Sequence, residues 1–104
     1  MQVREPQITE DGIIRCPSPD PDSYHEFRFA NGNVLYRRTN AAGQPYGEYA
    51  DWRALSGGII ADHYYAGADA LRRWFHGHGF TADHIHALRE QDEANKTAAR
   101  RRRR

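Results

Sequence analysis

The C-terminal end of the sequence carries its densest chemical signal. It contains one lysine followed by five consecutive arginines: Lys96, Arg100, Arg101, Arg102, Arg103 and Arg104. Clustered guanidinium groups bind phosphates through charge and paired hydrogen bonds. Residues 1–95 hold nine arginines against fourteen carboxylates, a net charge of −5, whereas residues 96–104 carry +6. This separation predicts that the basic end binds an anionic partner, in the first place nucleic acid.

Aromatic side chains give a second functional lead. All twelve Phe, Trp and Tyr residues lie between residues 24 and 80, and Tyr and Trp are enriched in binding hot spots. The candidates for contacts with a protein are Tyr24, Tyr46, Trp52, Tyr65 and Trp74. The alternative hypothesis is therefore a protein-binding module or inhibitor, of the type that phages and mobile elements encode, whose acidic body meets a host protein. The plainer interpretation is that these rings only pack in the core.

Four histidines lie within eleven residues: His76, His78, His84 and His86. Neutral imidazole is a common zinc ligand, and His76, His78 and His84 would converge if two helices met there. On a helix His84 and His86 point about 200° apart, so they cannot share one site. Neither cysteine nor carboxylate stands at a zinc-motif spacing. We expect histidines that pack or face solvent, with no metal and no cofactor.

Patterns for catalysis are weak. Cys16 has no base nearby in the sequence and precedes a proline. The run Ser56-Gly57-Gly58 lacks the strand–nucleophile–helix context of a hydrolase elbow, and lacks the lysine of a phosphate loop. Asp62 and His63 are adjacent, so their side chains diverge on a helix. We expect a protein that is not an enzyme.

Residues 71–90 read as a helix, a short glycine-containing turn and a second helix, which is the outline of a helix-turn-helix. If the second helix were a recognition helix, the side chains facing the bases would include few basic groups. They would be those of Ala82, Asp83, His84, His86 and Arg89. Asp83 would meet phosphates. The composition therefore favours an ordinary helical hairpin that closes the core.

The element that organises the chain is a hairpin over residues 24–39. Two alternating apolar runs flank Asn31-Gly32, which is the strongest short hairpin signal because a type I′ turn requires positive φ at both central residues. The turn sets Ala30 opposite Asn33, and the pairs that follow are Phe29 with Val34, Arg28 with Leu35, Phe27 with Tyr36 and Glu26 with Arg37. Phe27, Phe29, Val34 and Tyr36 then share the core face, and Glu26 with Arg37 forms an ion pair in water.

Shorter elements flank this hairpin. Residues 1–23 are expected to form an extended arm, with a possible edge strand at 12–16 and a proline-rich, polyproline-like connector after it. A third strand over residues 46–51 would complete a meander, and a four-residue loop would set Tyr49 opposite Val34.

The apolar period then changes to that of a helix. Ile60, Tyr64, Ala68, Leu71 and Phe75 form one stripe, with Asp69 and Arg73 paired on the other side. Gly67 leaves open whether residues 57–77 are one helix, or a strand at 58–62 followed by a helix from about Ala68. Gly77 suits the left-handed cap that ends this helix. Thr81 is the expected N-cap of the next helix, on which Ile85 and Leu88 face the core.

These elements predict an α+β fold, a short antiparallel meander packed by two C-terminal helices. The expected organisation is an arm (1–23), a single domain (24–90) and a solvent-exposed helix extension with an arginine-rich tail (91–104). No apolar run is long enough to cross a membrane, and a single cysteine fits a reducing compartment. We expect a small cytoplasmic protein; its oligomeric state is not encoded in any visible pattern.

Overall fold

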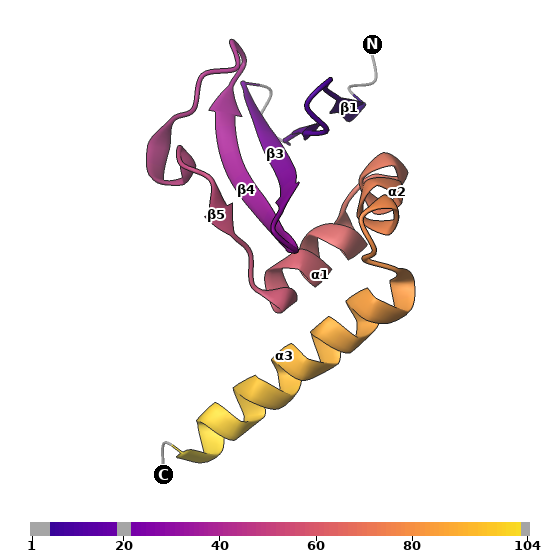
Figure 1. The fold of residues 1–104 in the computed structure, drawn as a ribbon. Helices are drawn as coiled ribbons and strands as arrows, with labels where there is room; N and C mark the ends of the chain where they lie inside the picture. The colour runs from indigo at the N-terminus through magenta and orange to yellow at the C-terminus, as the bar shows by residue number, and fades with distance from the viewer. Residues whose placement is uncertain (1–4, 19–21, 103–104) are drawn as a thin grey trace. The chain divides into compact units, whose positions relative to one another are not determined.

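The chain divides into two compact units, Met1–Leu55 and Ser56–Arg104. The computed structural model describes residues 5–18 and 22–102 (Figure 1). In this described part, the first unit contains an antiparallel sheet and a short 3-10 helix, and the second contains three α-helices. The α+β class is therefore confirmed. The division into an arm, a 24–90 domain and an extension stays a prediction, as does the packing of helices over the sheet.

The strands of the sheet lie side by side in chain order, each antiparallel to the next. They are β1 (Gln7–Ile8), β2 (Ile14–Pro17), β3 (Ser23–Ala30), β4 (Asn33–Asn40) and β5 (Arg53–Ala54). Figure 1 shows β3 and β4 as the two long central strands. Because every neighbour in the chain is also a neighbour in the sheet, the sheet forms by local pairing alone.

The central hairpin has the predicted turn and register. Asn31 and Gly32 have φ values of 54° and 80°, as a type I′ turn requires. Phe27 pairs with Tyr36 and Phe29 with Val34, so all four predicted core residues share one face. Of these, Phe29 is only half-buried, whereas the other three are buried.

The N-terminal side of the sheet is more ordered than predicted. The expected strand at 12–16 is present as β2, but it is not an edge, because β1 pairs with it through Ile8 and Ile14. Residues 19–21 of the proline-rich connector lie outside the described residues. Its two ends are joined, since the Ser18 N–H donates to the Ser23 carbonyl at 3.2 Å.

The predicted third strand at 46–51 is wrong. Asn40 folds the chain into a turn by accepting hydrogen bonds at its Oδ1 from the amides of Ala42 and Gln44, both at 3.0 Å. A single bridge pairs Thr39 with Pro45, and Gly47, at φ 74°, then diverts the chain into the 3-10 helix η1 (Gly47–Tyr49). The strand that does follow β4 is β5.

Tyr49 consequently does not pair with Val34. Its ring packs edge-on against Tyr36, with the ring centroids 5.8 Å apart. The pairs that β5 makes with β4 are Leu35 with Ala54 and Tyr36 with Arg53.

The helical unit consists of α1 (Gly57–Ala66), α2 (Asp69–Gly77) and α3 (Ala82–Arg102). Residues 57–77 are therefore neither one helix nor a strand followed by a helix, the two alternatives left open by the sequence, but two helices. A helix does begin beside Ala68, as the second alternative had it. The break is at Gly67, whose ψ of 175° leaves the helical region. A Cβ on Gly67 would lie 2.6 Å from the carbonyl oxygen of His63, which only glycine avoids.

An arginine stabilises this break. The Arg72 guanidinium donates to the carbonyl oxygens of Tyr64 at 3.2 Å and of Gly67 at 2.5 Å, which satisfies orphan groups at the end of α1. It also pairs with Asp69. The predicted Asp69–Arg73 pair is replaced by this pair, because Arg72 alone reaches back to the preceding turn.

The end of α2 and the start of α3 differ in how well they were predicted. Gly77 is not the left-handed cap; Gly79 is, at φ 90°. The N–H groups of Gly79 and Phe80 donate to His76 and Phe75 carbonyls in a Schellman motif. Thr81 is the predicted N-cap, since its Oγ1 accepts from the amide of His84 at 3.2 Å.

Each unit has its own buried apolar residues. In the first unit they include Ile14, Phe27 and Val34; in the second they are Ile60, Tyr64, Leu71, Trp74, Phe75, Phe80 and Ile85, together with Ala61. None of the helices in residues 5–18 and 22–102 is both long enough and apolar enough to span a membrane.

Candidate nucleic-acid interface

Helix α3 positions the basic end of the chain. Its first turn has the Thr81 cap and Asp83, both of which favour a helix N-terminus. Polar contacts one turn apart continue along it: His86 Nε2 lies 3.1 Å from a Glu90 carboxylate oxygen, and Lys96 forms an ion pair with Asp92, also at 3.1 Å. Asp83 in the first turn and the arginines at the end of α3 complement the helix dipole at its two termini.

Helix α1 holds the first half of α3. Arg89 pairs with Asp62 of α1 at 2.7 Å and lies over the ring of Tyr65, 4.6 Å from its centroid. Two glycines at the start of α1 permit close approach. A Cβ on Gly57 would lie 3.0 Å from the Leu88 side chain, and one on Gly58 would lie 2.6 Å from an Asp92 carboxylate oxygen.

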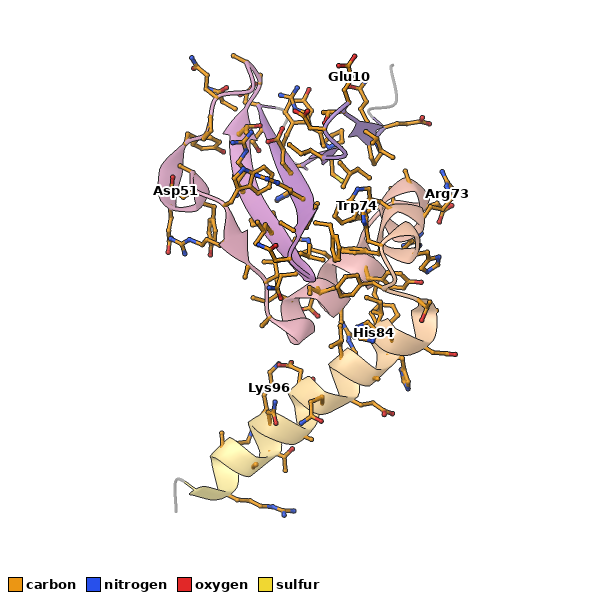
Figure 2. The ribbon with its side chains drawn as sticks, viewed as in Figure 1. Glu10, Asp51, Arg73, Trp74, His84 and Lys96 are labelled. Carbon is orange, nitrogen blue, oxygen red and sulfur yellow. The ribbon has the colours of Figure 1, made fainter. Side chains whose placement is uncertain are left out.

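Beyond Asp92 the described side chains of α3 are all exposed, through Arg101. More than two further turns of helix follow Asp92, which Figure 1 shows in yellow and on which Figure 2 labels Lys96. The basic residues stand at the far end of this extension.

The predicted phosphate-binding residues do not all have the same environment. Lys96 is already paired, with Asp92 at 3.1 Å and with Glu93 at 4.0 Å, and these carboxylates raise its pKa. Among the described residues Arg100 and Arg101 are exposed and form no ion pair. Arg102 ends α3, whereas Arg103 and Arg104 lie outside the described residues.

The helix-turn-helix interpretation gains little from the geometry. Helix α3 packs lengthwise on α1, as the Asp62–Arg89 pair shows, rather than forming its main contacts with α2. Arg89, the only arginine among the proposed base-reading residues, is occupied by that ion pair. The exposed remainder of that set is two histidines, an aspartate and an alanine.

The three histidines that were considered as metal ligands each contact a different neighbour. His76 Nε2 is hydrogen bonded to the Tyr64 hydroxyl at 2.7 Å. His78 packs on the Trp74 ring and His84 on the Phe80 ring, at centroid distances of 4.6 and 5.2 Å. In residues 5–18 and 22–102, no group of three His, Cys, Asp or Glu side chains is arranged to hold a metal.

The surroundings of the three residues considered for catalysis, Cys16, Ser56 and His63, account for each of them structurally. Burial raises the pKa of the Cys16 thiol to about 12, so it is a thiol and not a thiolate at neutral pH. Ser56 is the N-cap of α1, since its Oγ accepts from the Ile59 amide at 3.3 Å. Burial lowers the pKa of His63, which keeps that imidazole neutral.

The five aromatic candidates also differ in accessibility. Tyr46 and Tyr65 are exposed, at 41% and 46%, while Trp74 is buried against Phe75 and His78. Tyr24 and Trp52 are half-buried, each beneath an arginine. The structure brings none of these five rings into contact with another of the five in any interaction it describes. Exposed Tyr49, which was not a candidate, lies on the same short segment as Tyr46.

A set of charged residues on the sheet was not predicted as a site. Glu26 is buried, not in water, and its carboxylate pairs with Arg37 of β4 at 2.7 Å and with Arg15 of β2 at 3.7 Å. The alternation of Arg15 with Ile14 and Cys16 was the available signal. It was missed because β2 was expected at the edge, where its register was not assigned.

Comparison with known proteins gives no functional information. The chain matches no protein family model, no curated protein and no solved structure. Function must therefore be argued from the surfaces that the two units present.

Proposed function

We propose that the protein binds nucleic acid through the basic end of α3, by contacts to phosphates. The observation that carries the proposal is the extension of α3 beyond Asp92: its side chains are exposed through Arg101, and Arg100 and Arg101 pair with no carboxylate of the described residues. Guanidinium groups without an internal partner can replace the counterions of a polyanion at no cost in broken ion pairs. The acidic remainder of the chain opposes binding elsewhere.

Sequence preference should be slight. A recognition helix needs side chains that reach base edges in fixed geometry, whereas arginines at the end of an exposed helix reach phosphates first. Five arginines would give a log–log salt slope of about −4 to −5 on duplex DNA, which lowers affinity about 10²- to 10³-fold between roughly 50 and 200 mM salt.

Fluorescence anisotropy with a labelled duplex tests this proposal. The variant with Arg100→Gln, Arg101→Gln and Arg102→Gln leaves two arginines, so the slope should fall to about −2. Lys96→Gln is the matched control: its ammonium already has carboxylate partners, and the slope should change by much less than one. An unchanged slope in the triple variant would contradict the proposal.

The second candidate function is binding to a protein through exposed apolar and aromatic side chains. Tyr46 and Tyr49 are 41% and 40% exposed; Tyr46 precedes the 3-10 helix η1 and Tyr49 is its last residue. Rigid tyrosines of this kind supply contact area at low entropic cost. This function becomes the leading one if the intact protein fails to bind nucleic acid at low salt.

A further inference from the structure

One face of the sheet carries three arginines and a single carboxylate on its central strands. The register sets Arg15, Glu26 and Arg37 in one row across β2, β3 and β4, and Arg28 stands two residues along β3 on the same face. The unit Met1–Leu55 has six arginines against eight carboxylates. A surplus of two positive charges on this face is therefore a local concentration within an acidic unit.

Glu26 fixes two of these arginines without neutralising both. Its side chain is 8% exposed, and one carboxylate oxygen faces each guanidinium, at 2.7 Å for Arg37 and 3.7 Å for Arg15. The Nε and Nη2 atoms of Arg15 are buried and have no hydrogen-bond acceptor among the described residues. Donors left unpaired in this way cost stability, but the Arg15 side chain as a whole is 26% exposed, so its positive charge still acts at the surface of the sheet.

Aromatic rings line the same row. The Arg15 guanidinium carbon lies 3.9 Å from the centroid of the Tyr24 ring, and that of Arg37 lies 4.5 Å from the Trp52 ring. Stacked guanidinium and aromatic planes are the surfaces on which unpaired bases stack. Arg28 is exposed and forms no ion pair within the described residues, so it is free to contact a phosphate.

We infer that this arginine–aromatic face, made of Arg15, Tyr24, Arg28, Arg37 and Trp52, is a second binding surface, for single-stranded nucleic acid. The guanidinium groups neutralise successive phosphates, and Trp52 stacks on a base. In a duplex the bases are stacked on one another and cannot stack on Trp52, so the arginine–aromatic face prefers single strands. The surface uses none of the residues of the α3 end and does not depend on the function proposed above.

The test uses the full chain with Arg100→Gln, Arg101→Gln and Arg102→Gln. These substitutions weaken binding by the α3 end, so that binding by the sheet can be measured. A labelled oligothymidylate of about 20 nucleotides, and a duplex of equal length, report binding by anisotropy. We expect the oligothymidylate to bind more tightly than the duplex. Adding Arg28→Ala should lower its affinity about fivefold at 100 mM salt and reduce the salt slope by about 0.7.

Arg73→Ala is the matched control, because Arg73 is exposed, forms no ion pair with another described residue and lies on α2, in the other unit (Figure 2). It removes the same charge and should leave the affinity for the oligothymidylate within twofold of its parent. Equal losses in the two variants would mean that only net charge matters, and would overturn the inference.

A second readout concerns Trp52 itself. In a Trp74→Phe background Trp52 is the only tryptophan, and stacking on a base should quench its fluorescence as oligothymidylate is added. Trp52→Ala should weaken binding about 5- to 150-fold, the range for loss of one stacked base. Binding without quenching would refute the stacking role.

The outcomes separate the two proposals. Duplex binding that depends on the α3 arginines, with no single-strand binding left in the triple variant, would refute the arginine–aromatic face alone. Single-strand binding that is weakened about fivefold by Arg28→Ala but unaffected by the triple variant would support the face and count against the α3 end. Absence of binding to either probe at about 50 mM salt would refute both.

Discussion

The carboxylate of Glu26 is buried on the sheet between the guanidinium groups of Arg15 and Arg37. The hairpin register correctly set it opposite Arg37, but the expected environment was water. The structure buries the carboxylate between two arginines, because β2 pairs with β3 on its other side and brings Arg15 alongside. A carboxylate so placed is required by its neighbours: without it, two guanidinium groups would be left close together with no counter-charge.

We predict that Glu26→Gln lowers the free energy of unfolding by about 2–4 kcal/mol, somewhat less than for a fully buried pair because both arginines are about one quarter exposed. Phe27→Ala, which removes a ring that is 1% exposed, should cost about 3–5 kcal/mol. Urea denaturation measures both. Glu48→Gln, at an exposed carboxylate, is the control and should lie within about 0.5 kcal/mol of wild type. A Glu26→Gln protein as stable as this control would show that the buried row contributes nothing.

At the scale of elements, the sequence predicted well wherever a local rule is strict. Asn31-Gly32 has few alternatives to a type I′ turn, and that turn fixes eight residue pairs of the hairpin. Thr81 was recognised because a cap needs only a hydroxyl before a helix. The prediction of a strand at 46–51 was wrong because the side chain of Asn40 and the positive φ of Gly47 redirect the chain. The residue pattern alone does not show whether these two effects outweigh the preference of alternating apolar residues for a strand.

The break between α1 and α2 was not predicted, for a different reason. The apolar stripe from Ile60 to Phe75 continues through it, so periodicity alone reads one helix. What decides is the set of groups that replace the lost helical hydrogen bonds, above all the Arg72 guanidinium on the Tyr64 and Gly67 carbonyls. The basic face of the sheet escaped prediction similarly, since it needs residues from three strands.

This account predicts that Gly67→Ala destabilises the helical unit, although alanine is the better helix former. The added methyl group would meet the His63 carbonyl oxygen at 2.6 Å and the Leu71 side chain at 2.8 Å, so backbone must move. We expect a loss of about 1–3 kcal/mol in chemical denaturation. Gly77→Ala is the control, because nothing lies within 4 Å of its added Cβ; it should be neutral or gain up to about 1 kcal/mol. A stabilised Gly67→Ala protein would mean that α1 and α2 can join into one helix.

At the scale of the whole molecule, charge is divided between an acidic body and a basic end. The body carries −5 and the last nine residues +6, which raises the question of whether the end is held against the body. Within the described residues, the ion pairs of the basic end are formed inside α3 itself. Lys96 pairs with acids one turn back on its own helix, and Arg100 and Arg101 pair with none.

The arginines at the end of α3 should therefore be dispensable for stability. We predict that Arg100→Gln, Arg101→Gln and Arg102→Gln together shift the melting temperature by less than about 2 °C, at low and at high salt alike. Ile85→Ala, on the same helix but 0% exposed, is the positive control: a loss of about 2–5 kcal/mol should lower the melting temperature by 8 °C or more, by the scaling of about 4–8 °C per kcal/mol. Circular dichroism at 222 nm reports both. A fall for the triple variant at low salt that disappears at high salt would show that the end of α3 is attracted to the acidic body, and the salt slope of nucleic-acid binding would then include the release of that contact.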